Sequence, residues 1–280
     1  MTAFCRMPRA RPTGRPRHRA VSASRPRWVV GYTGEFVPSR ADELVFANVP
    51  VATAPLFADR RAAGRQLAAR LRRALAPPDR GEAGESPGGR VAPLVLALPR
   101  GGVAVAREVA DALEAPLDVL VTRKIGHPDQ PELGVGAIAE GDDPVYDDEL
   151  LARLRLSRAA LEPVVERERA ELQRRVDVYR GGRPLPDVAG RAVILVDDGL
   201  ATGVTARAAL RSLRGRSVGR TMLAVPVAAP SSAAAMRREA DAVVALLLPV
   251  TFRAVGEWYV AFDQLTDADV LKLLDREQAD

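Results

Sequence analysis

The sequence has few of the residue types that build several common kinds of functional site. It contains one cysteine, Cys5, which excludes a disulfide framework within the chain. Its two histidines, His18 and His127, lie far apart, so a metal site of the cysteine–histidine kind is excluded as well. Aromatic residues make up only 4% of the 280 residues, and Ala, Val and Leu must therefore fill most of the interior.

Long hydrophobic runs are also missing. No stretch of about 18 apolar residues occurs, so the sequence predicts no transmembrane helix and no membrane partner. The N-terminus lacks the continuous apolar segment of a secretory signal. We therefore expect a cytoplasmic protein.

Acidic residues are absent from residues 1–27, which hold eight arginines. Without these eight, 33 of the 41 basic residues stand against 36 acidic ones, a net charge of −3. The folded part thus gives no electrostatic reason to expect nucleic-acid binding. We interpret residues 1–50 as a basic, disordered extension with a short strand near residues 28–32. An organellar transit peptide and an arm that binds RNA or DNA remain alternatives for this tail.

From residue 51 to residue 280 the pattern is that of one α/β domain. Short, fully apolar segments, typical of strands buried on both faces, alternate with amphipathic ones, which predicts a parallel sheet flanked by helices. Residues 147–180 predict a helical insertion, broken near Ser157 or Pro163, and residues 123–133 a polar loop. Ligands of such sheets bind at the carboxyl ends of the strands. The expected strands and helices, in chain order, are helix 59–75, strand 91–98, helix 103–113, strand 117–122, strand 134–140, strand 193–196, helix 203–214, strand 221–227, helix 231–239, strand 242–248 and helix 266–275.

The segment Val193–Thr205 carries the strongest functional pattern. An apolar strand runs into two carboxylates, Asp197 and Asp198, and then into a turn rich in small residues before a helix. Backbone N–H groups at such a turn and helix N-terminus can hold a phosphate group. Two carboxylates beside an anion are useful if they bind neutral hydroxyl groups or a cation.

This loop resembles the signature of type I phosphoribosyltransferases, which bind 5-phosphoribosyl-1-pyrophosphate (PRPP). The resemblance implies that Asp197 and Asp198 hold the ribose hydroxyls and, indirectly, Mg²⁺, while the turn from Ala201 to Thr205 wraps the 5′-phosphate. Some relatives carry an acidic residue at the position of Ala201, where it assists proton transfer, and this chain lacks it. The PRPP-binding residues implied are Asp197, Asp198, Gly199, Leu200, Ala201, Thr202, Gly203, Val204 and Thr205.

Two further loops match the resemblance. The loop after strand 91–98 implies a diphosphate site at Arg100, Gly101 and Gly102. The segment 122–132 implies a flexible lid, in which Arg123 and Lys124 would neutralise the departing diphosphate. His127 has no evident partner there, and we interpret it as a surface residue.

The resemblance also implies a small hood, at about residues 249–265, that holds the acceptor base. Phe252, Trp258 and Tyr259 are the candidates for stacking on the base, with ordinary packing of these aromatic residues as the alternative. The hood differs most among relatives, so the base stays unidentified.

Together these features predict Mg²⁺-dependent transfer of a phosphoribosyl group from PRPP to a nitrogen nucleophile, a nucleobase, with release of pyrophosphate. Lys124, Arg100 and Asp198 are the predicted catalytic residues, and their roles are electrostatic. The alternative is a regulatory module that binds PRPP or a nucleotide without turnover. The charged helical insertion is a candidate homodimer contact and suits a solvated helix equally well.

Overall fold

The computed structural model describes residues 28–30, 36–38, 56–75 and 92–275. Its centre is a five-stranded, wholly parallel sheet in the order β10-β9-β8-β3-β4. The five strands are β3 (Leu94–Ala97), β4 (Leu117–Val119), β8 (Ala192–Val196), β9 (Arg220–Val227) and β10 (Ala242–Leu247). The predicted parallel sheet flanked by helices is confirmed.

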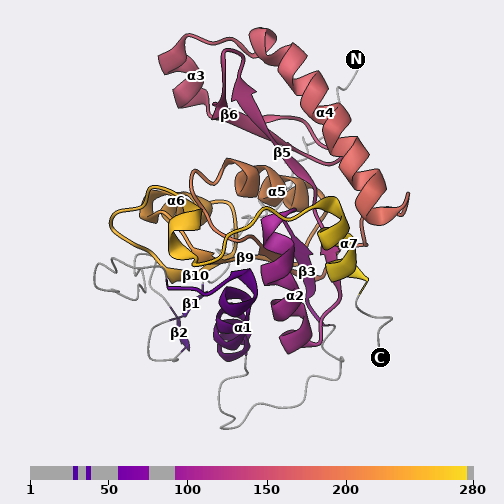
Figure 1. The fold of residues 1–280 in the computed structure, drawn as a ribbon, viewed down its shortest axis with the longest axis vertical. Coiled ribbons are helices and arrows are strands. Elements are labelled where there is room, and N and C mark those ends of the chain that lie inside the picture. Colours follow the sequence, from indigo (N-terminus) through magenta and orange to yellow (C-terminus); the bar gives the residue numbers. More distant parts are fainter. Residues whose placement is uncertain (1–27, 31–35, 39–55, 76–91, 276–280) are drawn as a thin grey trace, which may run out of the picture.

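Helices cover both faces of this sheet (Figure 1). Alternate strand residues point to opposite faces. Val95 and Ile194 pack into the core shared with α1 (Arg60–Leu75), α2 (Gly101–Leu113) and α7 (Asp267–Leu274). Leu96 and Leu195 pack into the core shared with α5 (Val204–Gly215) and α6 (Pro230–Met236). Because both faces are covered, the central strands β3 and β8 are apolar along their whole length.

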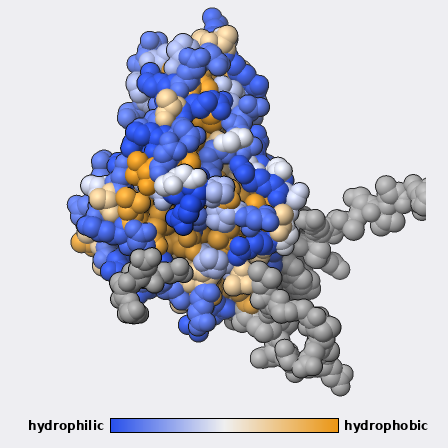
Figure 2. Space-filling view, turned by 90° about the vertical axis from the view of Figure 1, so that its right-hand side faces the viewer, coloured by the Kyte–Doolittle hydropathy of each residue, from blue (hydrophilic) through white to orange (hydrophobic). Residues whose placement is uncertain are grey.

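A second region stands above the sheet in Figure 1 and consists of residues 122–180; we call it the upper region. Its three-stranded antiparallel sheet contains β5 (Thr122–His127), β6 (Gln130–Ala139) and β7 (Val145–Tyr146), and α3 (Asp148–Leu154) and α4 (Arg158–Arg180) complete it. At its base, a buried ion pair joins Glu140 to Arg180. Seen from the side, the upper region is covered mostly by hydrophilic residues (Figure 2).

The expected polar loop at residues 123–133 is wrong, because these residues form most of the β5–β6 hairpin. Thr122 pairs with Ala139 and His127 with Gln130, with register shifts on both sides of Gly126. Polar residues are tolerated in this hairpin because only part of it is buried, and Ile125 supplies a fully buried side chain. Likewise, the strand expected to reach residue 122 ends at Val119, and Thr122 begins the hairpin.

Three helix starts follow the capping residues in the sequence. The Asp59 carboxylate accepts from the Ala62 N–H at 2.7 Å at the start of α1. Ser157 caps α4, so the helical insertion breaks there and not at Pro163, which lies inside α4. Thr266 and Asp269 form a complete capping box on α7.

A two-stranded sheet and a 3₁₀ turn are the remaining elements of the described residues. The strands β1 (Trp28–Val30) and β2 (Phe36–Pro38) pair antiparallel, and β2 is a strand where the sequence analysis expected disorder. The rest of the expected disordered extension lies outside the described residues. A single 3₁₀ turn, η1 (Val255–Trp258), lies in the expected hood. Among the helices that the structure describes, none combines the length and apolar character needed to cross a membrane.

Candidate functional site

The expected diphosphate loop and PRPP loop lie against each other at the carboxyl ends of two neighbouring strands. β3 and β8 pair in parallel, and the Leu98 N–H continues this pairing with a 2.9 Å bond to the Val196 carbonyl. A Cβ atom on Gly101 would lie 1.9 Å from Asp198 Oδ2, and one on Gly102 would lie 2.8 Å from the Val196 carbonyl oxygen. Only glycine permits this approach, so both glycines bring the loops together.

Asp197 and Asp198 form a tightly coupled carboxyl pair at the end of β8. The Asp198 N–H donates to Asp197 Oδ1 at 2.8 Å. Burial raises the pKa of Asp197 well above its ordinary value, and the neighbouring charge of Asp198 raises it further. Burial also raises the pKa of Asp198, while a nearby arginine opposes this rise. A ligand that supplies hydroxyl donors or positive charge would therefore stabilise the ionised form of this pair.

That arginine is Arg60, the first residue of α1. Its Nε lies 2.8 Å from Asp198 Oδ2, and its Nη1 donates to the Asp263 carbonyl oxygen at 2.7 Å. The guanidinium carbon lies 3.8 Å from the centroid of the Phe262 ring, a cation–π contact. Since the side chain is only 11% exposed, Arg60 is held on three sides and fixes the position of the Asp198 carboxylate.

The turn after the carboxyl pair is shaped for an anion. Gly203 caps α5 in the left-handed region, with φ of 74°, and turns the chain into the helix. The first N–H groups of α5 have no partner inside the helix and face outward from its N-terminus. Thr202 precedes this helix and is exposed, and Thr205 lies in its first turn and is half-buried, so both can supply hydroxyl donors.

Hydrogen bonds to residues 227–232 hold the same turn in place. Leu200 donates its N–H to the Val227 carbonyl at 2.9 Å and accepts at its own carbonyl from the Ala229 N–H at 2.8 Å. The Ser232 hydroxyl donates to the Ala201 carbonyl oxygen. Anchoring of this kind leaves the backbone N–H groups of the turn preorganised.

Mg²⁺ fits this site only as an ion shared with substrate. In the described part of the chain, no group of three or more His, Cys, Asp or Glu residues could hold a metal ion. Asp197 and Asp198 supply hard carboxylate oxygens, but one Asp198 oxygen already faces Arg60. Magnesium typically takes one or two carboxylates together with waters and substrate phosphates, and this donor set suits that mode.

Arg100, expected at the diphosphate, is the N-cap of α2, and the peptide bond that joins it to Pro99 is cis. Its side chain is 34% exposed and lies 3.8 Å from Asp267 Oδ1 at the start of α7. Asp267 also accepts from the Tyr179 hydroxyl at 2.6 Å and from Arg174. The hydrogen bond from Tyr179 is the main cause of the lowered pKa of Asp267. Arg100 is therefore held beside a carboxylate and can exchange it for another anion.

Arg123 and Lys124, the expected lid cations, contact other residues of the upper region. Arg123 Nη2 lies 2.7 Å from Glu168 of α4. Lys124 Nζ donates to the Glu132 carbonyl oxygen at 3.0 Å across the hairpin. Neither cation pairs with Asp197 or Asp198 in the described structure. The expected surface residue His127 lies at the tip of the same hairpin, where its Nδ1 accepts from the Asp129 N–H at 3.1 Å.

In the expected hood, Trp258 and Tyr259 are buried in an aromatic cluster, and Phe252 is half-buried beside them. The Tyr259 hydroxyl donates to the Asp198 carbonyl oxygen. Burial is the main cause of the raised pKa of Tyr259. A Cβ on Gly199 would lie 2.4 Å from Val255 Cγ1, so η1 packs directly on the PRPP loop. Tyr259 thus supports this loop from behind.

Sequence reasoning missed three residues that shape the site: Arg60, Asp267 and Val255. Each lies far along the chain from the loop it contacts. Asp267 lies within the Thr266–Asp269 capping box and Val255 within the expected hood, but neither feature identifies the loop that the residue contacts. The only signal for Arg60 was its place after Asp59, the N-cap of α1.

A parallel α/β core with a carboxyl pair before a turn that offers free N–H groups is the arrangement expected of a phosphoribosyltransferase-type protein. The family model described as the phosphoribosyl transferase domain matches residues 66–256, and the chain belongs to this family. It is 44% identical over 225 residues to a Mycobacterium tuberculosis (strain H37Rv) protein named "Putative phosphoribosyl transferase Rv0571c". That match covers 80% of this chain and 48% of the relative, so the chain spans about half the length of the curated relatives it matches.

A solved structure shows the same fold. The crystal structure of TT1426 from Thermus thermophilus is 41% identical, covers 78% of this chain and 97% of its own, and superposes with a TM-score of 0.61. The resemblance implied by the PRPP loop is therefore confirmed at the level of the family.

Proposed function

We propose that this protein transfers the phosphoribosyl group of PRPP to a nitrogen nucleophile, a nucleobase, with Mg²⁺ as cofactor and pyrophosphate as product. The observation that carries the proposal is the carboxyl pair Asp197–Asp198 directly before the anchored turn and N-terminus of α5. This arrangement offers acceptors for two ribose hydroxyls beside donors for a phosphate. Membership of the phosphoribosyltransferase family supports the same assignment.

Each loop then has a distinct role. The turn from Ala201 to Thr205 binds the 5′-phosphate, and Asp197 and Asp198 accept hydrogen bonds from the ribose hydroxyls. When bound, Mg²⁺ neutralises charge on the diphosphate and is held indirectly by the same carboxylates. The N-terminus of α2, which begins at Gly101, supplies N–H groups for the diphosphate.

The reaction needs charge stabilisation rather than a covalent intermediate on the protein. The bond between ribose C1 and the diphosphate oxygen breaks, and its electron pair leaves with pyrophosphate. The lone pair of the acceptor nitrogen forms the new bond to C1, and the proton of that nitrogen passes to water. Arg100 and Lys124 would stabilise the charge on the departing diphosphate, and Asp198 holds the ribose in place.

The proposal requires two cations to change partners. Arg100 would leave Asp267 for the diphosphate, and the β5–β6 hairpin would bring Lys124 and Arg123 over the site. These exchanges are accessible, because Arg100 and Lys124 are 34% and 43% exposed and surface ion pairs are worth about 1 kcal/mol or less. Closure of this kind also excludes water from the reacting carbon. Phe252 is the least buried of the three aromatic candidates, and it is therefore the one we propose to contact the acceptor.

The first test is calorimetric titration of PRPP with Mg²⁺ into the full chain and into the Asp197→Asn/Asp198→Asn variant. The wild type should bind and the variant should lose binding while keeping its circular dichroism spectrum. Folded wild-type protein that binds no PRPP would overturn the proposal. Turnover would then be followed as pyrophosphate release with a panel of purine and pyrimidine bases.

One feature favours a second candidate, a module that binds PRPP or a nucleotide without turnover. Ala201 stands where some relatives carry an acid, and no titratable side chain replaces it at that position. Tight PRPP binding without pyrophosphate release on any base of the panel would favour this regulatory function.

A further inference from the structure

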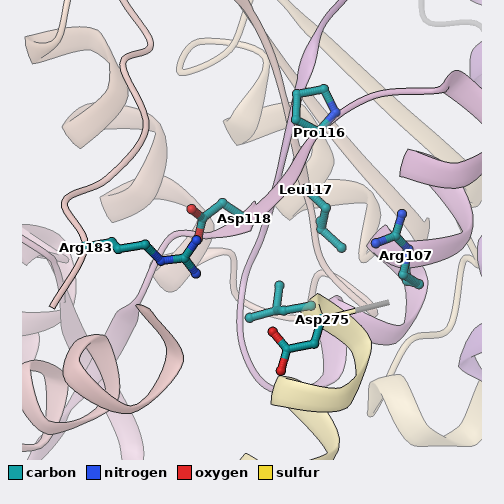
Figure 3. A pocket seen from close by; sticks show the side chains of 7 residues that line it. Arg107, Pro116, Leu117, Asp118, Arg183 and Asp275 are labelled. Carbon is teal, nitrogen blue, oxygen red and sulfur yellow. The ribbon is translucent and has the colours of Figure 1, made fainter. Parts of the chain in front are cut away.

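A polar cavity of about 400 Å³ lies away from the PRPP loop, beside the edge strand β4 (Figure 3). Its lining comes from four segments: α2, the start of β4, the C-terminal end of α7 and the chain after α4. The residues are Arg107, Pro116, Leu117, Asp118, Arg183, Leu274 and Asp275. Since Asp267, at the other end of α7, pairs with Arg100, about 12 Å of helix separates this cavity from the proposed diphosphate site.

Within the described ranges, three charged side chains of the cavity form no ion pair. Among the described residues, Asp118, Arg183 and Asp275 form no ion pair within 4 Å, and Arg183 Nε donates only to the Arg180 carbonyl at 3.1 Å. In Figure 3 the Asp118 carboxylate is directed toward the Arg183 guanidinium. The Asp118 carboxylate accepts from the Val119 N–H through Oδ1 at 2.7 Å, which leaves Oδ2 for a ligand group.

Arg107 gives an independent indication of a ligand. It is only 8% exposed and lines the cavity, and its Nε has no hydrogen-bond partner in the described structure. Its Nη2 donates to Asp111, which leaves the rest of the guanidinium fork unpaired. Buried polar groups almost always have a partner, and leaving one unmet costs about 1–3 kcal/mol. A carboxylate in the cavity would supply a second acceptor for this guanidinium group.

The charges of the cavity balance, and this selects the kind of ligand. Two arginines provide an anion subsite, while Asp118 and Asp275 provide a cation subsite. Burial raises the pKa of Asp118, while the hydrogen bond from the Val119 N–H and the charges of Arg180 and Arg183 oppose this rise. The negative end of the α7 dipole, beside Asp275, also favours a cation. A purely anionic ligand would meet two carboxylates, so a molecule with both charges fits better.

We propose that this cavity binds a small zwitterion, an α-amino acid with an apolar side chain. Its carboxylate is held by Arg107 and Arg183, and its ammonium group lies between Asp118 and Asp275. Leu117 and Leu274 contact its side chain. The site is separate from the PRPP site and does not depend on the proposed transferase activity.

The test is isothermal titration of the full chain with three probes of matched shape. L-Leucine carries both charges, 4-methylpentanoate only the carboxylate and 3-methylbutylamine only the ammonium. We expect saturable binding of L-leucine. Each half-analogue should bind at least about tenfold more weakly, because it lacks one of the two charged contacts. No saturable binding of L-leucine to folded protein would overturn the proposal. Equal binding of 4-methylpentanoate would overturn it too, since the site would then be an anion site.

Variants at exposed positions separate this site from the fold. Arg183→Gln and Asp275→Asn should each weaken L-leucine binding by about tenfold or more without unfolding, since both side chains are exposed. Arg153→Gln, at an exposed arginine of α3 outside the cavity, is the matched control and should bind normally. Asp198→Asn should keep L-leucine binding while affecting PRPP. Wild-type affinity in both cavity variants, or a parallel loss in Arg153→Gln, would contradict the assignment.

Discussion

Replacing Gly101 by alanine should separate the two loops of the proposed PRPP site. The new Cβ would lie 1.9 Å from Asp198 Oδ2 and 2.6 Å from its Cγ, whereas ordinary contact begins near 3.4 Å. The carboxylate would have to move by about 1.5 Å, the difference between these distances. It cannot move freely, because it is bound to Arg60, which would itself lie 3.1 Å from the new atom.

Overpacking of this kind costs about 1–3 kcal/mol. If the displaced carboxylate is the ribose ligand, most of this cost appears as lost PRPP affinity, about tenfold to a hundredfold at 1.4 kcal/mol per decade. The assay is calorimetric titration of PRPP with Mg²⁺, with circular dichroism to confirm folding. Gly215→Ala is the matched control, because its Cβ would meet nothing within 4 Å.

The control should bind PRPP like the wild type. Wild-type PRPP affinity in folded Gly101→Ala would refute this prediction. Either the Asp198 carboxylate would not lie where the structure has it, or it would not contact the ribose. An equal loss in Gly215→Ala would instead show that affinity reports general stability.

Three further substitutions test the contacts around the site. Arg60→Met should weaken PRPP binding about tenfold to a hundredfold in the same titration. The reason is the loss of a charged hydrogen bond that positions Asp198 and is worth about 1.5–3 kcal/mol. The control is Arg65→Met, at a 58% exposed arginine of the same helix, and it should bind PRPP like the wild type. Asp267→Asn should strengthen PRPP binding by up to about fivefold, because Arg100 loses its competing carboxylate; unchanged affinity would argue against partner exchange. Glu171→Gln should lower the urea-unfolding free energy at pH 7 by up to about 1 kcal/mol. Hydrogen bonding to Arg174 lowers the pKa of Glu171 to about 2, so this stabilisation is present above pH 4.5 and should be lost as the pH falls toward 2.

The central sheet could be predicted from sequence because its signal is local. Val193–Val196 is apolar without interruption, and its two neighbours in the sheet are likewise short apolar segments. The segment that indicates the family is equally local, since its carboxyl pair, turn and helix N-terminus lie within thirteen consecutive residues, 193–205, while PRPP binding there stays a prediction. All residues of this pattern lie in one continuous segment, so it can be recognised without the structure.

The hairpin was missed because the half of it near the tip is mostly exposed. Most residues from Lys124 to Leu133 are polar or half-exposed, and the register shifts on both sides of Gly126 remove the strict alternation that marks a strand. The pairing is fixed by tertiary contacts, chiefly those of Ile125 and Val135 with the core shared by α4. Propensity and periodicity carry no information on such contacts.

Arg60 shows why the rest of a site escapes sequence reasoning. Its bond to Asp198 joins residues 138 positions apart, and 39 of the 280 residues are arginines, so residue type gives no distinction. What sets Arg60 apart is its place at the first turn of α1, where the helix is directed at the end of β8 by the packing of Gly64 on α2. A Cβ at Gly64 would lie 2.7 Å from the Val105 carbonyl oxygen, so only a glycine there lets α1 pack this closely on α2. The same close packing positions Arg60 beside the carboxyl pair. The identity of the group that positions Asp198 is therefore decided by helix packing, which only the structure shows.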